Sequence, residues 1–265
     1  TYNLATVLRR RGRWPEARAL YGEALDAWLR LYGETHPSVA HARNSLALLA
    51  ADLGDYASAE ATYREILLNS VQRLGADHPD TQMIRTNLAA TLLELGQHEQ
   101  AEVLCRASLE AYRRIHDGPH PAVAASLLVL GRVLHARGDH AGARNAFDAA
   151  LHIHDQTVGE LHPDRAKVLE GLADLHADEG RLDAALELTR RAAVVYGQTL
   201  GADHPRLAGA LAREGRLLLA SGDPSAAVAP LQRSIDIWIV VLPADHSDLA
   251  RVRRDLDACL AEPGR

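Results

Sequence analysis

The stretch GADHPDTQMIRTNLAATLLELGQHEQA, residues 75–101, decides the fold of this chain of 265 residues. It carries a His-Pro dipeptide, then apolar residues spaced three and four apart, then a glycine. Proline suits the first turn of a helix, where its missing N–H costs nothing, and the apolar spacing is that of an amphipathic helix. We therefore predict a helix from Pro79 to Leu95, ended by Gly96 in the left-handed conformation. A second helix is expected from His98 to Ile115.

These marks recur every 42 residues (78 − 36, 120 − 78 and so on) along the whole chain. The marker histidines are His36, His78, His120, His162 and His204, each followed by proline, and His246, followed by serine. Glycines recur with the same period from Gly12 to Gly222, and alanines from Ala17 to Ala227. One helical hairpin cannot bury its own apolar face, whereas stacked hairpins share a continuous core. We predict an all-α, right-handed superhelical solenoid of six helical hairpins plus a C-terminal capping helix.

The repeat array is expected to span 1–242, with repeats at about 1–33, 34–75, 76–117, 118–159, 160–201 and 202–242. The segment 243–265 is predicted to add a capping helix from Ser247 to Leu260, with a polar outer face, and a frayed C-terminus. Because the chain starts without methionine and already reads as helix, we expect a piece of a longer protein. In the last repeat, Glu214 replaces a core leucine, which suggests looser packing, and Pro230 should kink or shorten the second helix.

The composition agrees with helices and excludes several classes of protein. Hydrophobic residues make up 47% and aromatic residues 4%, which argues against an all-β fold and against disorder. The formal charge of −6 and the pI of about 6.1 show no basic excess for nucleic acid or an anionic membrane. The longest apolar run, residues 122–130, is about half a membrane span. Two cysteines far apart in the sequence favour a reducing, cytoplasmic location.

The order Gly-x-x-His-Pro, Asn-x-Leu-Ala, Gly, Ala-Glu and Tyr resembles the 42-residue tetratricopeptide repeats of kinesin light chains, and residues 74–102 preserve it best. The resemblance implies a non-enzymatic protein–protein interaction module whose concave groove, lined by the first helices, binds a peptide or a partner domain. Such arrays resemble the scaffold or regulatory parts of larger bacterial signalling proteins, including serine/threonine kinases and nucleotide-binding signalling ATPases. The alternative is a self-association or autoinhibitory module that binds a segment of its own parent protein, and a more remote one is an enzyme.

The repeat register identifies the side chains expected to line this groove. Asparagine amides can pair with the main chain of an extended peptide, and arginines can take acidic side chains. The candidates for the peptide groove are Asn3, Thr6, Arg9, Asn44, Leu48, Asn87, Arg132, His135, Arg213 and Arg216. Repeats four to six lack the Asn-x-Leu-Ala signature, so an asparagine clamp is expected in the first three repeats alone. The alternative is that these are ordinary solvated residues.

The sequence predicts neither catalytic nor metal-binding chemistry. Six of the fourteen histidines are repeat markers, and an intervening helix keeps equivalent positions too far apart for one metal ion. We expect these histidines to pack between repeats and to hydrogen-bond in turns. No nucleotide-binding, zinc-protease or kinase motif is present, so we expect no catalytic residue, no cofactor and no metal site. Cys105 falls at a core position, where a thiol is usually inert, and Asp55, Asp139 and Asp223 are predicted to cap second helices.

Overall fold

The computed structural model describes residues 1–261, and residues 262–265, the predicted frayed end, lie outside this part. The described chain contains thirteen helices and no strand, which confirms the all-α prediction. The helices are α1 (Tyr2–Arg10), α2 (Trp14–Tyr32), α3 (Pro37–Asp52), α4 (Tyr56–Leu74), α5 (Pro79–Glu94), α6 (His98–Ile115), α7 (Pro121–Ala136), α8 (His140–Thr157), α9 (Pro163–Asp178), α10 (Leu182–Thr199), α11 (Pro205–Ala220), α12 (Pro224–Val241) and α13 (Ser247–Ala261).

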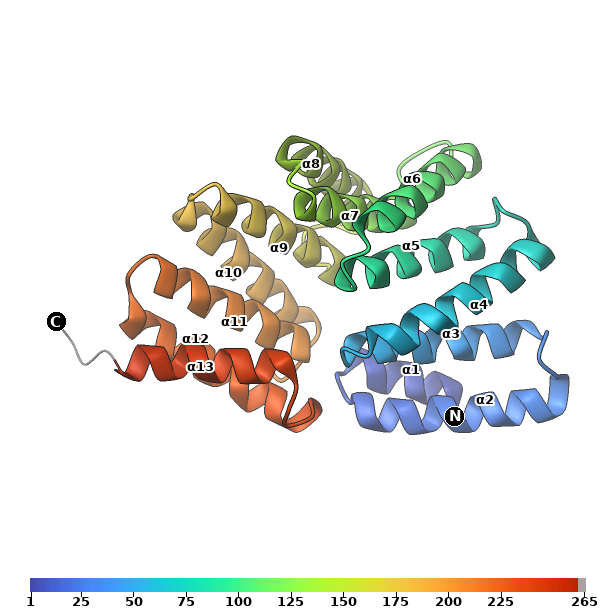
Figure 1. The fold of residues 1–265 in the computed structure, drawn as a ribbon, viewed down its shortest axis with the longest axis horizontal. Coiled ribbons are helices and arrows are strands. Elements are labelled where there is room, and N and C mark those ends of the chain that lie inside the picture. Colours follow the sequence, from blue (N-terminus) through green and yellow to red (C-terminus); the bar gives the residue numbers. More distant parts are fainter. Residues whose placement is uncertain (262–265) are drawn as a thin grey trace. The chain divides into compact units, whose positions relative to one another are not determined.

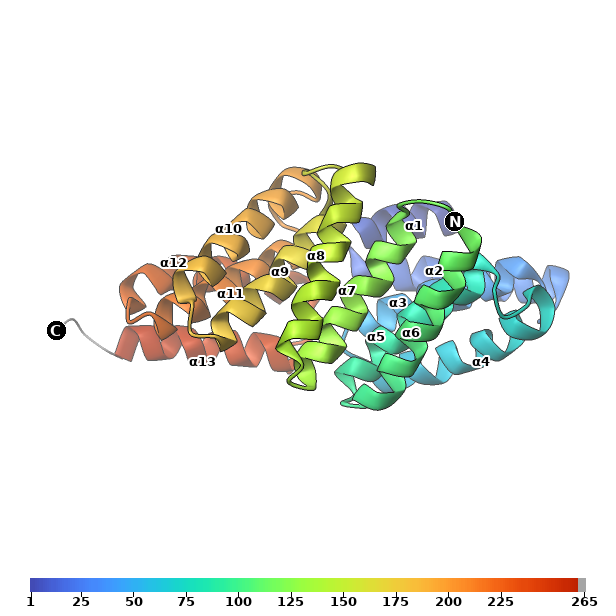
Figure 2. The same ribbon diagram turned by 90° about the horizontal axis from the view of Figure 1, so that it is seen from above.

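The chain divides into two compact units, Thr1–Thr157 with α1 to α8 and Val158–Arg265 with α9 to α13. Within each unit the helices pair into hairpins, and each hairpin packs on the next (Figure 1). The first helices of neighbouring hairpins also touch one another, as α3 does with α5 and α5 with α7. In the second unit α13 lies along α12 and α11 as a final unpaired helix (Figure 2). We call the edge formed by α1, α3, α5 and α7, or by α9, α11 and α13, the inner face of its unit.

The marker histidines cap the first helices. In all six, Nδ1 of the imidazole accepts a hydrogen bond from the backbone N–H two residues further on, at 3.1–3.2 Å. Each bond satisfies one of the orphan donors at a helix N-terminus. Because Nδ1 accepts, the ring proton of each neutral imidazole sits on Nε2. This geometry confirms the expected hydrogen bonding in turns, and the histidine caps of α3, α5, α7, α9, α11 and α13 each use Nδ1 as an acceptor.

Glycine and aspartate form the turn between the two helices of a hairpin. Gly96 has a φ of +73° directly after the C-cap of α5, as predicted, and only glycine adopts this conformation readily. Asp55, Asp139 and Asp223 each accept the backbone N–H three residues on, which confirms them as N-caps of the second helices. The sequence predicted α6 with the bounds that the structure has.

The core lies between the two helices of each hairpin. The periodic alanines on the second helices, from Ala17 to Ala227, are fully buried because two helices cross closely there. The larger residues at the next core position, Tyr21, Tyr63, Cys105 and Phe147, are also buried, at 0–1% exposure. The alanines that recur every 42 residues therefore lie in the core of each hairpin.

The last hairpin differs from the prediction in one respect. The expected shortening at Pro230 was wrong, because α12 has 18 residues, as α6, α8 and α10 have, with the proline inside it. The bonds and packing on either side of Pro230 outweigh the one N–H that it lacks. Glu214 is half-buried and accepts a 2.7 Å bond from Arg190 of α10, so the leucine position is filled by an ion pair. The looser packing of this repeat stays a prediction.

Candidate functional site

Several polar side chains on the inner face bond to the next first helix at a spacing of 43 residues. The hydroxyls of Tyr2 and Ser45 lie 2.8 Å apart, and Asn87 Nδ2 donates to Asn44 Oδ1 at 3.3 Å. In the second unit Arg213 donates to Glu170 at 3.1 Å. In each pair the second residue comes 43 positions after the first. These pairs occupy the register positions that the sequence assigned to the groove, so much of its polar chemistry joins repeats together.

Three of the four candidate arginines are neutralised within the chain. Arg9 donates to Asp52 at 3.0 Å and Arg132 to Glu94 at 2.7 Å. Arg213 makes two further bonds, at 2.8 and 2.9 Å, to Asp174. Burial alone would lower the pKa of Arg213, but its carboxylate partners hold that pKa above its ordinary value. An arginine held in this way is a structural cross-link rather than an open receptor for an acidic ligand.

The second unit also contains an incomplete pair. Asp255 of α13 occupies the register position of Arg213, and Ala212 stands where a polar partner would be. Asp255 Oδ2 is buried without a hydrogen-bond partner. Arg216, half-buried nearby, donates no hydrogen bond to any residue within 1–261, and its pKa is lowered by burial, then by Arg251 and Arg213. Since Asp255 also attracts Arg216, these two groups partly compensate each other.

The other candidates have mixed environments. Asn3 is exposed and Leu48 is half-buried on the inner face. Thr6 donates to the carbonyl of Tyr2 and accepts from the hydroxyl of Tyr21, so its hydroxyl links α1 to α2. His135 packs edge-on against His140 at 5.5 Å between ring centroids. The structure therefore places these four residues without joining them into one site.

The asparagine pair keeps groups for a ligand. Asn44 uses its carbonyl oxygen and Asn87 its amide nitrogen, at 3.3 Å. The amide nitrogen of Asn44 and the carbonyl oxygen of Asn87 make no further bond within residues 1–261. One unused donor and one unused acceptor side by side match the C=O and N–H of an extended peptide.

Asn87 also lines a hollow in the first unit that sequence reasoning missed. This hollow, of about 490 Å³, is bounded by α5, the end of α6 and the start of α7, and we call it the α5–α7 pocket. Its lining is Pro79, Asp80, Met83, Thr86, Asn87, Tyr112, His116, His120, Ala122 and Ala125. The available signal was His116, an extra histidine four residues before the marker His120.

Three rings stack along the α5–α7 pocket. The ring centroids of Tyr112 and His116 are 5.8 Å apart, and those of His116 and His120 are 3.8 Å apart with 9° between their planes. Burial, with the neighbouring His116, lowers the pKa of His120, and burial raises the pKa of Tyr112 to about 12. Both shifts favour the neutral form of the group concerned, the imidazole of His120 and the phenol of Tyr112.

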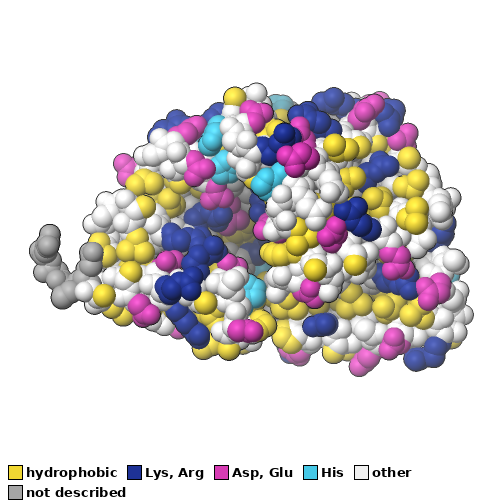
Figure 3. Space-filling model, in the orientation of Figure 1, with side chains coloured by type: hydrophobic (Ala, Val, Ile, Leu, Met, Phe, Trp, Pro, Cys, Tyr) yellow, Lys and Arg dark blue, Asp and Glu magenta, His cyan; other side chains and the backbone are white. Residues whose placement is uncertain are grey.

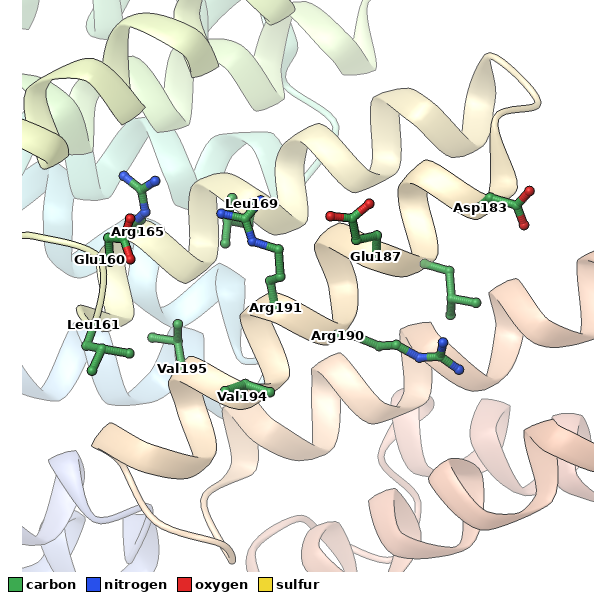
Figure 4. A pocket seen from close by; sticks show the side chains of 11 residues that line it. Glu160, Leu161, Arg165, Leu169, Asp183, Glu187, Arg190, Arg191, Val194 and Val195 are labelled. Atoms are coloured by element: carbon green, nitrogen blue, oxygen red, sulfur yellow. The ribbon is translucent and has the colours of Figure 1, made fainter.

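A second hollow, of about 560 Å³, lies on α9 and α10 of the second unit (Figure 4). Its apolar surface includes Leu161 and Val194, which are 62% and 55% exposed. Its rim carries Glu187, Arg190 and Arg191. Arg190 is held by Glu214, so this rim too is partly neutralised internally.

Three surface and core properties bear on the remaining expectations from the sequence. On the face shown in Figure 3, acidic and basic side chains both occur on each unit, and several basic side chains lie together on the second unit. Within residues 1–261, no helix is long and apolar enough to cross a membrane. Cys105 is fully buried, and burial raises its pKa to about 12, as expected for an inert thiol.

Comparison with known proteins identifies the family. A family model described as Tetratricopeptide repeat matches residues 1–67, 80–156 and 164–239. The chain therefore belongs to the tetratricopeptide repeat family, whose members are generally scaffolds for protein–protein interaction. A search of curated proteins finds no match to the sequence.

Solved structures share the fold at low sequence identity. BtubC (BKLC) from P. vanneervenii has a TM-score of 0.60 at 21% identity, over 86% of this chain and 91% of that chain. A Podosopora anserina putative kinesin light chain has a TM-score of 0.53 at 22% identity, over 77% and 97%. Rap protein, solved in complex with competence and sporulation factor, has a TM-score of 0.67 at 14% identity, over 98% and 74%. These likenesses confirm a helical solenoid of the kinesin light chain type.

Proposed function

We propose that the inner face of the first unit binds an extended peptide segment of a partner protein. The observation that carries the proposal is the Asn44–Asn87 pair, which keeps one donor and one acceptor unused between α3 and α5. Membership of the tetratricopeptide repeat family supports it, as does the bound factor in the Rap complex, whose fold is similar. The proposed role is that of a non-enzymatic scaffold or regulatory part of a larger bacterial signalling protein, acting in the cytoplasm.

A peptide display library selected on the full chain tests this proposal. The affinity of a selected peptide is then measured for the double variant Asn44→Ala, Asn87→Ala and for the control Asn69→Ala, an exposed asparagine on α4. Losing two hydrogen bonds of about 1 kcal/mol each should weaken binding roughly 30-fold. The control should bind as the wild type does.

Two results would contradict the proposal. Equal binding by the double variant would show that the asparagine pair does not contact the peptide. Failure to select any peptide, together with a mass in light scattering that rises with concentration, would favour the self-association module. Circular dichroism of both variants establishes that the helices are intact.

A further inference from the structure

The position of Asp80 in the α5–α7 pocket can be compared with its equivalents in other repeats. The 42-residue register aligns Asp80 with Asp164 and Asp248, and all three follow a histidine cap by two residues. Asp164 pairs with Lys167 at 2.6 Å, and Asp248 pairs with Arg251. In both cases the cation stands three residues after the aspartate, on the same face of the helix. The same position after Asp80 is Met83.

Asp80 consequently has no cationic partner within residues 1–261. The nearby imidazole of His78 has its Nδ1 3.9 Å from Asp80 Oδ2. That nitrogen accepts the backbone N–H of Asp80, so it carries no proton and the two groups form no ion pair. The side chain of Asp80 is 48% exposed, and Met83 is 39% exposed beside it. The carboxylate of Asp80 is therefore open, whereas the equivalent carboxylates in two other repeats are each paired with a cation three residues further on.

The rest of the α5–α7 pocket suits a planar cation. No lysine or arginine lines it, so Asp80 is its one formal charge when the imidazoles are neutral. Tyr112, His116 and His120 form an aromatic wall of the pocket, in which Tyr112, 2% exposed, is the buried support and His116 lies between the other two rings. The half-buried ring of His120, at the end of this stack, offers surface on which a guanidinium can stack. Met83 and Ala125 offer apolar surface to the methylenes of a long side chain.

We propose that the α5–α7 pocket binds an arginine side chain of the partner, with its guanidinium on Asp80 and against the aromatic wall. The proposal deepens the proposed function and rests on it, because the arginine belongs to the peptide held by Asn44 and Asn87. The net charge of −6 adds a general attraction for a basic segment. The bound arginine takes the place that Lys167 and Arg251 occupy in their repeats.

The experiment is a nuclear magnetic resonance titration of the full chain with N-acetyl-arginine amide, followed on the ring C–H signals of His116 and His120. The wild type should show saturable shifts, and N-acetyl-citrulline amide, the uncharged isostere, should bind about tenfold more weakly or worse. Asp80→Asn should lose the response. Met83→Lys should also lose it, since the new lysine pairs with Asp80 as Lys167 pairs with Asp164.

The matched control is Asp164→Asn, which removes a carboxylate that is already paired and should leave the titration unchanged. Equal shifts with the citrulline probe or with N-acetyl-phenylalanine amide would overturn the proposal, as would an unchanged response in Asp80→Asn. Because the probe is a single amino acid, this test is separate from peptide selection. A selected peptide without arginine that depends on Asn44 and Asn87 would refute the pocket and keep the groove.

Discussion

Gly131 of α7 offers a test of the packing between the two helices of a hairpin. Its register equivalents in the first, second, third and fifth repeats are alanines, Ala5, Ala47, Ala89 and Ala173. In the fourth repeat, a Cβ added at Gly131 would lie 2.6 Å from Phe147 Cε1 and 2.7 Å from Phe147 Cδ1. Carbon atoms normally approach to about 3.5–4.0 Å. We therefore expect Gly131→Ala to force Phe147 out of its position.

Two opposing effects determine how much Gly131→Ala changes the free energy of unfolding. Alanine stabilises a helix interior by about 1 kcal/mol relative to glycine, and overpacking a core costs about 1–3 kcal/mol. Gly131→Ala should therefore lower the free energy of unfolding by about 0–2 kcal/mol. The third repeat carries Cys105 at the position of Phe147. In a Phe147→Cys background the new methyl has room, and the same substitution should stabilise by about 1 kcal/mol.

The assay is a double-mutant cycle on the full chain, with urea unfolding followed by circular dichroism. Phe147→Cys alone should cost about 3 kcal/mol, as large-to-small changes in a core do. The coupling energy between the two substitutions should be about 1–3 kcal/mol, the difference between the two effects of Gly131→Ala. Additivity within about 0.5 kcal/mol would refute the reasoning.

Three further predictions concern charge and protonation. The folded pKa of His120 lies below the unfolded value of about 6.5, so His120 should stabilise the fold above that pH, and this stability should be lost as the pH falls toward the folded pKa. His120→Asn, a cap that does not titrate, should therefore remove part of the pH dependence of Tm. An unchanged pH dependence would contradict this. Arg213→Ala leaves Glu170 and Asp174 without their arginine and should lower the free energy of unfolding, measured with urea, by about 2 kcal/mol. The loss for Arg233→Ala, at an exposed pair, should be under about 1 kcal/mol, and equal losses would disprove a special role for Arg213. Cys105 should react with thiol reagents only after unfolding, and rapid native labelling would show that it is accessible.

The sequence predicted most of the fold because its marks act locally. A proline after a capping histidine, a glycine with positive φ and an aspartate before a second helix each determine one helix end through bonds within a few residues. The period of 42 residues then repeats these local decisions along the chain. Pro230 does not shorten α12, because a helix inside a stacked array is stabilised by its neighbours, which compensate for one missing hydrogen bond. The kink that the sequence also allowed stays a prediction.

The groove was predicted less well, since the register shows which face a side chain occupies but not what it bonds to. Arg9, Arg132 and Arg213 were expected to face a ligand, and each is bonded to a carboxylate of the chain. Their partners come 38 to 43 residues away in sequence, so no local pattern reveals the pairs. The sequence analysis did not propose Asp80 as a site residue. What distinguishes it from Asp164 and Asp248 is the absence of a cation three residues further on, where this repeat has Met83.

By itself, the sequence determined that this protein is an array of helical hairpins, because helix periodicity, caps and turns depend on neighbours in the chain. The tertiary structure decided which of the inner-face groups are already satisfied by the next repeat and which are left for a partner. A polar group makes a limited number of hydrogen bonds and ion pairs, and each needs a partner within a few ångströms. Whether Asn44, Asn87 and Asp80 are available to a ligand therefore depends on which side chains the packing of the helices brings close to them.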